Sequence, residues 1–85
     1  MTEVYTVLSD YIRAAMGRAE YEKLDDGTYY GEIPGLQGVY ANESKLEACR
    51  AELQSALEDW ILFGLSNGFP IPPLDGIDLT TAKVA

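Results

Sequence analysis

Residues 44–68 read SKLEACRAELQSALEDWILFGLSNG, and their apolar side chains recur every three or four positions. This spacing predicts one long amphipathic helix, because side chains three and four residues apart share a helical face. At about 1.5 Å per residue such a helix spans roughly 30–35 Å, which is long enough to lie across a whole sheet. The chain's single tryptophan belongs to this stripe, and we expect it to anchor the core. The predicted stripe consists of Leu46, Cys49, Leu53, Ala56, Leu57, Trp60, Ile61 and Leu65.

Both ends of this helix carry sequence signals. Ser44 and Glu47 have the spacing of a capping box, in which each side chain accepts a hydrogen bond from a free backbone amide. We therefore expect the helix to begin at Lys45. At the other end, Asn67 and Gly68 predict a left-handed cap.

The segment before the helix has the pattern of a strand meander. Residues 19–24 and 28–33 are short runs, rich in tyrosine, on either side of Asp25-Asp26-Gly27, and this arrangement predicts a β-hairpin. Residues 34–38 contain proline and two glycines, so they end the second strand and redirect the chain. A third strand is then expected at residues 39–41.

The two ends of the chain complete the predicted domain. Residues 3–16 carry an apolar helical stripe, which predicts a first helix within residues 1–17. That stripe could cover the opposite face of the sheet or pack against a second protomer, and both alternatives stay open. Residues 76–80 alternate like a last short strand, and residues 81–85 are expected to be a frayed tail. We expect one α+β domain over residues 1–85, with its core at 19–80.

Composition narrows the possible partners. The chain has 85 residues, 14 acidic against 6 basic, with a formal net charge of −8. Direct binding to DNA or RNA is not expected, because contacts with phosphate dominate nucleic-acid affinity and an acidic chain repels phosphate. An acidic field attracts a basic protein instead. With six tyrosines, two phenylalanines and one tryptophan, so small a chain is also expected to self-associate.

Several kinds of catalytic and cofactor-binding site lack the residues that they need in this sequence. Cys49 is the single cysteine and there is no histidine, so neither a thiol nor a serine nucleophile has its usual base. We expect Cys49 to be a small buried apolar residue. Gly-rich phosphate loops are absent, and no cofactor is expected. No segment has the pattern of a signal peptide or reaches the roughly 20 apolar residues of a membrane span, so a cytoplasmic protein is expected.

One run of residues resembles a known family. Residues 29–42, YYGEIPGLQGVYAN, precede a helix that contains Ala56-Leu57-Glu58-Asp59-Trp60 and a proline-rich exit at 71–74, IPPL. Over residues 19–79 this order resembles the HicB-like antitoxin family. The resemblance implies a partial ribonuclease-H-like fold of order β-β-β-α-β, in which a fourth strand returns beside the first. The helix at 3–16 is an addition to the commonest pattern.

Three positions depart from the family's pattern. Gly35 and Gln37 stand where many members carry aspartate and a second proline, and both residues still suit a turn. Asn42 stands where members usually carry glycine before the second helix. Because asparagine tolerates positive φ best after glycine, we expect the same backbone shape there.

The resemblance also implies a function. HicB-type proteins neutralise a small basic HicA-type toxin that cleaves mRNA, and many carry a further DNA-binding domain. This chain stops at Ala85 without one, so we expect a short form that does not bind its operator directly. An orphan protein-interaction or regulatory module of the same fold is the alternative. A divalent-metal ribonuclease is the third, and its candidate ligands would be Asp25, Asp26, Glu32, Glu47 and Asp78.

Two surfaces are candidates for partner binding, and no residue is assigned a catalytic role. The hairpin combines tyrosines with acidic side chains, and strand alternation sends Tyr29 and Tyr30 to opposite faces, so one of them lies outside the core. This patch suits protein recognition, or a homodimer seam. The second surface is the acidic side of the long helix, for which a solvated face is the simpler reading. The candidates are Tyr29, Tyr30, Glu32, Asp25 and Asp26 on the hairpin, and Glu47, Glu58 and Asp59 on the helix.

Overall fold

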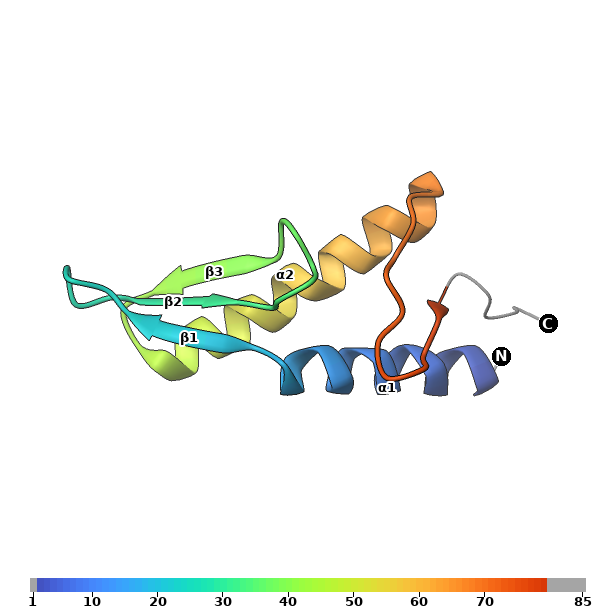
Figure 1. Ribbon diagram of the computed structural model, residues 1–85, viewed down its shortest axis with the longest axis horizontal. Helices are drawn as coiled ribbons and strands as arrows, with labels where there is room; N and C mark the ends of the chain where they lie inside the picture. The colour runs from blue at the N-terminus through green and yellow to red at the C-terminus, as the bar shows by residue number, and fades with distance from the viewer. Residues whose placement is uncertain (1, 80–85) are drawn as a thin grey trace.

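The computed structural model describes residues 2–79, with side chains from residue 7 onward. Its element order confirms the predicted helix, three-stranded meander and long helix (Figure 1). The elements are α1 (Thr2–Gly17), β1 (Glu20–Lys23), β2 (Tyr29–Glu32), β3 (Tyr40–Glu43) and α2 (Leu46–Asn67). None of the helices within this range combines the length and apolarity needed to cross a membrane.

The sheet is antiparallel, with strand order β1-β2-β3. The predicted hairpin turn is confirmed, because Gly27 closes it at φ 88°. The prediction for Asn42 is wrong, since this residue lies inside β3 rather than at positive φ. Its amide donates hydrogen bonds to Tyr29 O and Thr28 Oγ1, both at 2.9 Å. These bonds hold the strand in register, and β3 therefore extends to Glu43 instead of ending at Ala41.

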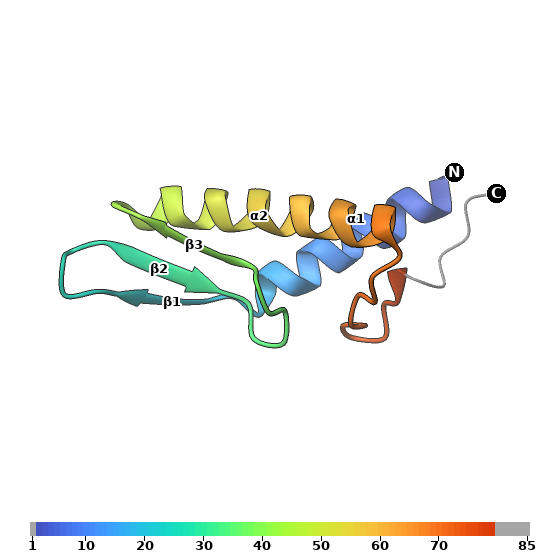
Figure 2. The ribbon, with the colours of Figure 1, turned by 90° about the horizontal axis from the view of Figure 1, so that it is seen from above.

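α2 packs lengthwise on the sheet, over β3 and β2 (Figure 2). Its buried side chains are Cys49, Leu53, Leu57 and Ile61, as the stripe predicts. Trp60 is only half-buried and packs at the margin of the core rather than in its centre. Gly31 on β2 allows the close approach, because a Cβ there would lie 2.9 Å from the Tyr21 ring and 3.2 Å from Cys49 Sγ.

The two ends of α2 differ in how well the sequence predicts them. The prediction of a capping box is wrong. Lys45 is the N-cap residue, with an extended backbone and no side-chain cap hydrogen bond. Because the helix begins one residue later than expected, Glu47 is its second residue instead of the third, and the box geometry is lost. The left-handed C-terminal cap is confirmed, with Gly68 at φ 71° and its N–H donating to Gly64 O.

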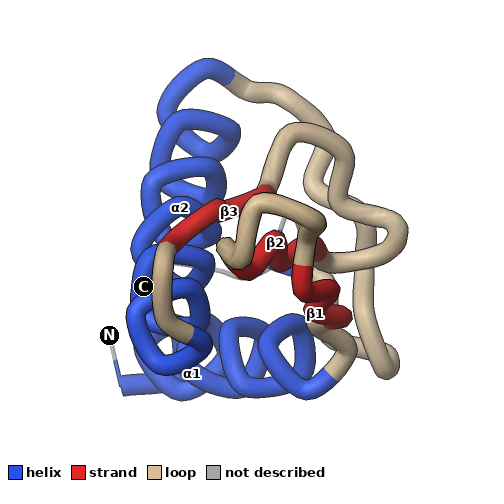
Figure 3. The backbone as a smooth tube through the Cα atoms, turned by 90° about the vertical axis from the view of Figure 1, so that its left-hand side faces the viewer, coloured by secondary structure: helices blue, strands red, loops and turns tan. Residues whose placement is uncertain are grey.

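α1 does not cover the opposite face of the sheet, so that alternative is wrong. It lies beyond the end of the sheet and packs against α2 (Figures 1 and 2), and the end-on view of Figure 3 shows the two helices on adjoining sides of the core. Tyr11 and Ala15 of its stripe are fully buried. The chain after α2 returns to α1, where Arg18 forms an ion pair with Asp75.

The predicted fourth strand is also wrong within residues 2–79. Leu74 and Ile77 form an isolated bridge around a tight turn, with Leu74 N to Ile77 O at 3.0 Å and Ile77 N to Leu74 O at 2.7 Å. Asp75 and Gly76 both have positive φ, at 49° and 79°, as a type I′ turn requires. The alternating apolar residues Ile77 and Leu79 pack on the core, in which Leu79 is buried. Thr80 and the predicted tail at 81–85 lie outside the described residues.

Candidate partner-binding surface

The face of the sheet that points away from α2 is assembled by strand alternation. Tyr21, Gly31 and Ala41 pair across the strands and face α2, so the residues next to them in each strand point the other way. No helix packs on this side within the described chain. We call it the outer sheet face, and it consists of Glu20, Glu22, Tyr30, Glu32, Tyr40 and Asn42.

Two tyrosines form the centre of the outer sheet face. The Tyr30 and Tyr40 rings stack, with centroids 6.3 Å apart and an interplanar angle of 24°. Tyr40 is 57% exposed although it is a large aromatic residue. The Tyr30 hydroxyl donates a 3.1 Å hydrogen bond to Glu32 Oε1. Burial raises the pKa of Tyr30 above its ordinary value, and the hydrogen bond to Glu32 and that carboxylate's charge raise it further.

The outer sheet face carries three carboxylates and no basic residue. Glu20 pairs directly with Glu32, and like charges opposite each other destabilise a sheet. Glu22 lies on the same face, opposite Tyr30. Lys23 belongs to the other face, where its Nζ lies 5.9 Å from the centroid of the Tyr29 ring. Among the described residues, no lysine or arginine forms an ion pair with these three carboxylates.

The outer sheet face is hollowed rather than flat. A cavity of about 160 Å³ is lined by Glu20, Glu22, Tyr30 and Glu32, together with the ring of Tyr21. A second cavity, of about 410 Å³, lies between Tyr30 and Tyr40 and the turn at residues 33–39. Side chains of a binding partner could occupy these two hollows.

The predicted hairpin residues are only partly brought together. Tyr30 and Glu32 share the outer sheet face, whereas Tyr29 packs against the core. Asp26 holds the turn, because its Oδ1 accepts hydrogen bonds from Thr28 N at 2.9 Å and Thr28 Oγ1 at 2.6 Å. These bonds, the side-chain one first, lower the pKa of Asp26. Asp25 is exposed in the same turn.

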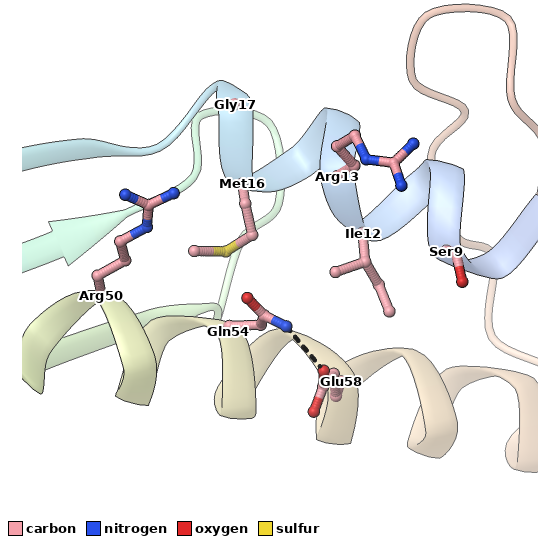
Figure 4. A pocket seen from close by; sticks show the side chains of 8 residues that line it. All are labelled: Ser9, Ile12, Arg13, Met16, Gly17, Arg50, Gln54 and Glu58. Carbon is pink, nitrogen blue, oxygen red and sulfur yellow. Dashed lines mark hydrogen bonds between the residues drawn. The ribbon is translucent and has the colours of Figure 1, made fainter. Parts of the chain in front are cut away.

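The acidic residues of α2 do not form one patch. Glu47, Glu58 and Asp59 are all exposed, but Asp59 lies about 100° around the helix from Glu58. Glu58 accepts a 3.1 Å hydrogen bond from Gln54 Nε2, one helical turn earlier. Both residues border a cavity of about 560 Å³ between the two helices (Figure 4). Its lining residues are Ser9, Ile12, Arg13, Met16, Gly17, Arg50, Gln54 and Glu58.

The residues of the outer sheet face that the sequence did not single out are Glu20 and Glu22. The available signal was the register of the first two strands, since Glu20 pairs with Glu32 and Glu22 pairs with Tyr30. The register of two strands depends on the loop that joins them, and the residues of the turn at 34–38 did not specify how β3 pairs with β2.

The structure also locates the candidate metal ligands and the cysteine. Among the side chains that the structure describes, from residue 7 to residue 79, no three of His, Cys, Asp or Glu converge so as to hold a metal ion. Cys49 is buried, as predicted, and its Sγ lies 3.6 Å from Ala41 O. Burial raises the pKa of its thiol.

Comparison with known proteins gives the chain its family. A family model described as UPF0150-like matches residues 10–72, which span the second half of α1, the whole sheet and α2. The chain belongs to the UPF0150-like family. No curated protein matches it.

A solved structure shares the UPF0150-like chain's fold almost end to end. It is the crystal structure of TTHA0281 from Thermus thermophilus, which is 46% identical, with a TM-score of 0.81. The match covers 93% of this chain and 95% of that one. Because α1 has 16 of the 85 residues, most of α1 must lie within the match. The first helix is therefore not peculiar to this UPF0150-like chain.

Proposed function

We propose that this UPF0150-like chain is a HicB-like antitoxin-type protein, which binds and neutralises a small basic RNA-cleaving toxin of the HicA type. It does so by covering the surface that the toxin's RNA would occupy. The proposal joins two lines of support. The run at residues 29–42 resembles HicB-like antitoxins, and within that run Tyr30, Glu32 and Tyr40 lie on the outer sheet face.

The observation that carries the proposal is this uncovered acidic and aromatic face. An RNA-binding protein presents lysine and arginine side chains to phosphate. Carboxylates such as Glu20 and Glu32 accept charge-assisted hydrogen bonds from the same cations. The exposed ring of Tyr40 can receive an arginine guanidinium by cation–π contact. The face therefore offers a toxin the charge and stacking surfaces that its RNA would offer.

The proposed role is binding rather than catalysis. The carboxylates of the outer sheet face are spread along strands rather than gathered around one point. A two-metal nuclease needs several carboxylates that converge on ions roughly 4 Å apart. An orphan regulatory module of the same fold would use the same face for a different basic protein.

Recovery of the partner tests the proposal. The full chain is used as bait in its native host at moderate salt, and bound small proteins are identified by mass spectrometry. The proposal predicts a small basic protein encoded beside this chain, which degrades RNA when alone and stops doing so when the chain is added. Recovery of a basic protein without RNA-cleaving activity would reject the antitoxin function and favour the orphan module.

A further inference from the structure

Two arginines of this acidic chain border the cavity of about 560 Å³ between α1 and α2 (Figure 4). We call this cavity, with the eight lining residues given above, the interhelical groove. Arg13 comes from α1 and Arg50 from α2, and among the described residues that line the groove Glu58 has the one carboxylate. Two positive charges against one negative charge make the lining cationic, whereas the whole chain has a net charge of −8.

The wall that α1 contributes to the interhelical groove carries apolar side chains. In Figure 4 the side chains of Ile12 and Met16 point from α1 toward α2. Both pack against the core, yet both stay partly exposed. Small-molecule pockets have volumes of roughly 300–1,000 Å³ and combine an apolar lining with a few polar groups, and they occur between packed helices. The interhelical groove has this size, this composition and this position.

Arg50 is the cation that is available to a ligand. Its side chain is exposed, and it forms no ion pair with any carboxylate that the structure describes. Arg13, in contrast, is paired with Asp10 at 3.2 Å. The carboxylate of Glu58 accepts the 3.1 Å hydrogen bond from Gln54 Nε2. Because a guanidinium group binds a carboxylate through two parallel hydrogen bonds, Arg50 selects for a ligand with that group.

We propose that the interhelical groove binds a small organic anion, whose carboxylate pairs with Arg50 and whose apolar body lies against Ile12 and Met16. In Figure 4 the Met16 side chain extends toward Arg50, so one molecule can contact both. An organic cation of the same shape would leave Arg50 unpaired and be repelled by its charge. The outer sheet face points away from α2, so the groove is a separate site and the proposal does not depend on the antitoxin function.

Octanoate is the probe for this site, because it joins one carboxylate to a linear apolar chain. It is titrated into the isotope-labelled full chain, and the backbone amide signals are followed by nuclear magnetic resonance. Octanol and octylamine are the matched ligands, with the same apolar chain and with no charge or a positive charge. We expect saturable shifts at amides of α1 and α2 around the groove. Octanoate should bind at least about tenfold more tightly than either matched ligand, since only octanoate forms a charged hydrogen bond with Arg50.

Three variants locate the two parts of the ligand. Arg50→Gln should lower the affinity for octanoate by at least about tenfold, because it removes the charged donor. Lys45→Gln is the matched control, since Lys45 is an exposed cation at the start of α2 that does not line the groove. Its affinity should match that of the wild type. Met16→Gln should weaken octanoate and octanol alike, because it replaces part of the apolar wall. The amide spectrum of each free variant shows whether it is folded.

Several results would overturn the proposal. Octanoate that shows no saturable binding would reject the site, and so would shifts that cluster at the C-terminal end of α2. Equal affinities for octanoate and octanol would show that no cation selects the ligand. A loss in Lys45→Gln as large as that in Arg50→Gln would contradict the role of Arg50. All of these measurements use the isolated chain, so a negative result here leaves the test of toxin binding unaffected.

Discussion

The phenolic hydroxyl of Tyr11 donates a 2.6 Å hydrogen bond to the backbone carbonyl of Pro72, 61 residues further along the chain. It ties the middle of α1 to the proline-rich segment after α2. The Tyr11 side chain is fully buried at this junction. Together with the Arg18–Asp75 ion pair, this hydrogen bond joins α1 to the segment after α2, so its loss should weaken the domain.

Tyr11→Phe removes the donor while keeping the ring. We expect the free energy of unfolding to fall by about 1–3 kcal/mol, because the Pro72 carbonyl is left without its partner in a partly buried site. Urea denaturation followed by circular dichroism measures the change. A lower midpoint with an unchanged slope is the expected result. An unchanged midpoint would mean that solvent replaces the bond at no cost.

Tyr11 also predicts a loss of stability in alkali. Burial raises its pKa above the ordinary 10.0, and Asp78 raises it further while Arg18 opposes the shift. Above about pH 10 the unfolded chain has released this proton and the folded chain still holds it. The free energy of unfolding therefore decreases as pH rises. Below about pH 10 the Tyr11 hydroxyl makes its full contribution to the free energy of unfolding. The melting temperature of Tyr11→Phe should therefore fall less steeply with alkaline pH than that of the wild type, and parallel curves would contradict the assignment.

Gly31→Ala tests the close approach of α2 to the sheet. An added Cβ would lie 2.9 Å from the Tyr21 ring and 3.2 Å from Cys49 Sγ, so we expect a loss of about 1–3 kcal/mol by overpacking. Gly17→Ala is the matched control, because a Cβ there meets nothing within 4 Å. Thermal melts that show equal stability for the two variants would argue against the packing described.

The opposed carboxylates of the outer sheet face predict a gain in stability. Glu20→Gln combined with Glu32→Gln removes the repulsion across β1 and β2. We expect the free energy of unfolding at low salt to rise by about 0.2–1 kcal/mol. The gain should shrink in high salt, which screens exposed charges. A loss of stability at low salt would show that these carboxylates support the fold.

The sequence predicted those features that depend on neighbouring residues. The hairpin required a glycine at positive φ, and Gly27 supplied it. The period of α2 and its cap at Gly68 were equally local. The turn at 74–77 was missed because Ile77 and Leu79 alternate as a strand would, while tertiary packing uses that alternation to bury side chains against the core.

The candidate surface was predicted in part for the same reason. Alternation separated Tyr29 from Tyr30 correctly, since it needs only one strand. The pairing of Tyr40 and Glu20 with Glu32 depends on register across three strands, which no single segment encodes. Leu65 was assigned to the core by its spacing, yet the chain turns away at Gly68 and leaves it 47% exposed.

The central claim is that a basic toxin binds the outer sheet face, and its most direct test is the affinity of the recovered partner for two charge-matched triple variants. Glu20→Gln, Glu22→Gln and Glu32→Gln neutralise the face, whereas Glu47→Gln, Glu52→Gln and Asp59→Asn remove the same charge from α2. Calorimetric titration should show affinity reduced by at least about tenfold for the first variant, since each lost charged hydrogen bond costs about 1.5–3 kcal/mol, and little changed for the second. Equal losses in both variants, or a loss confined to the α2 variant, would contradict the account.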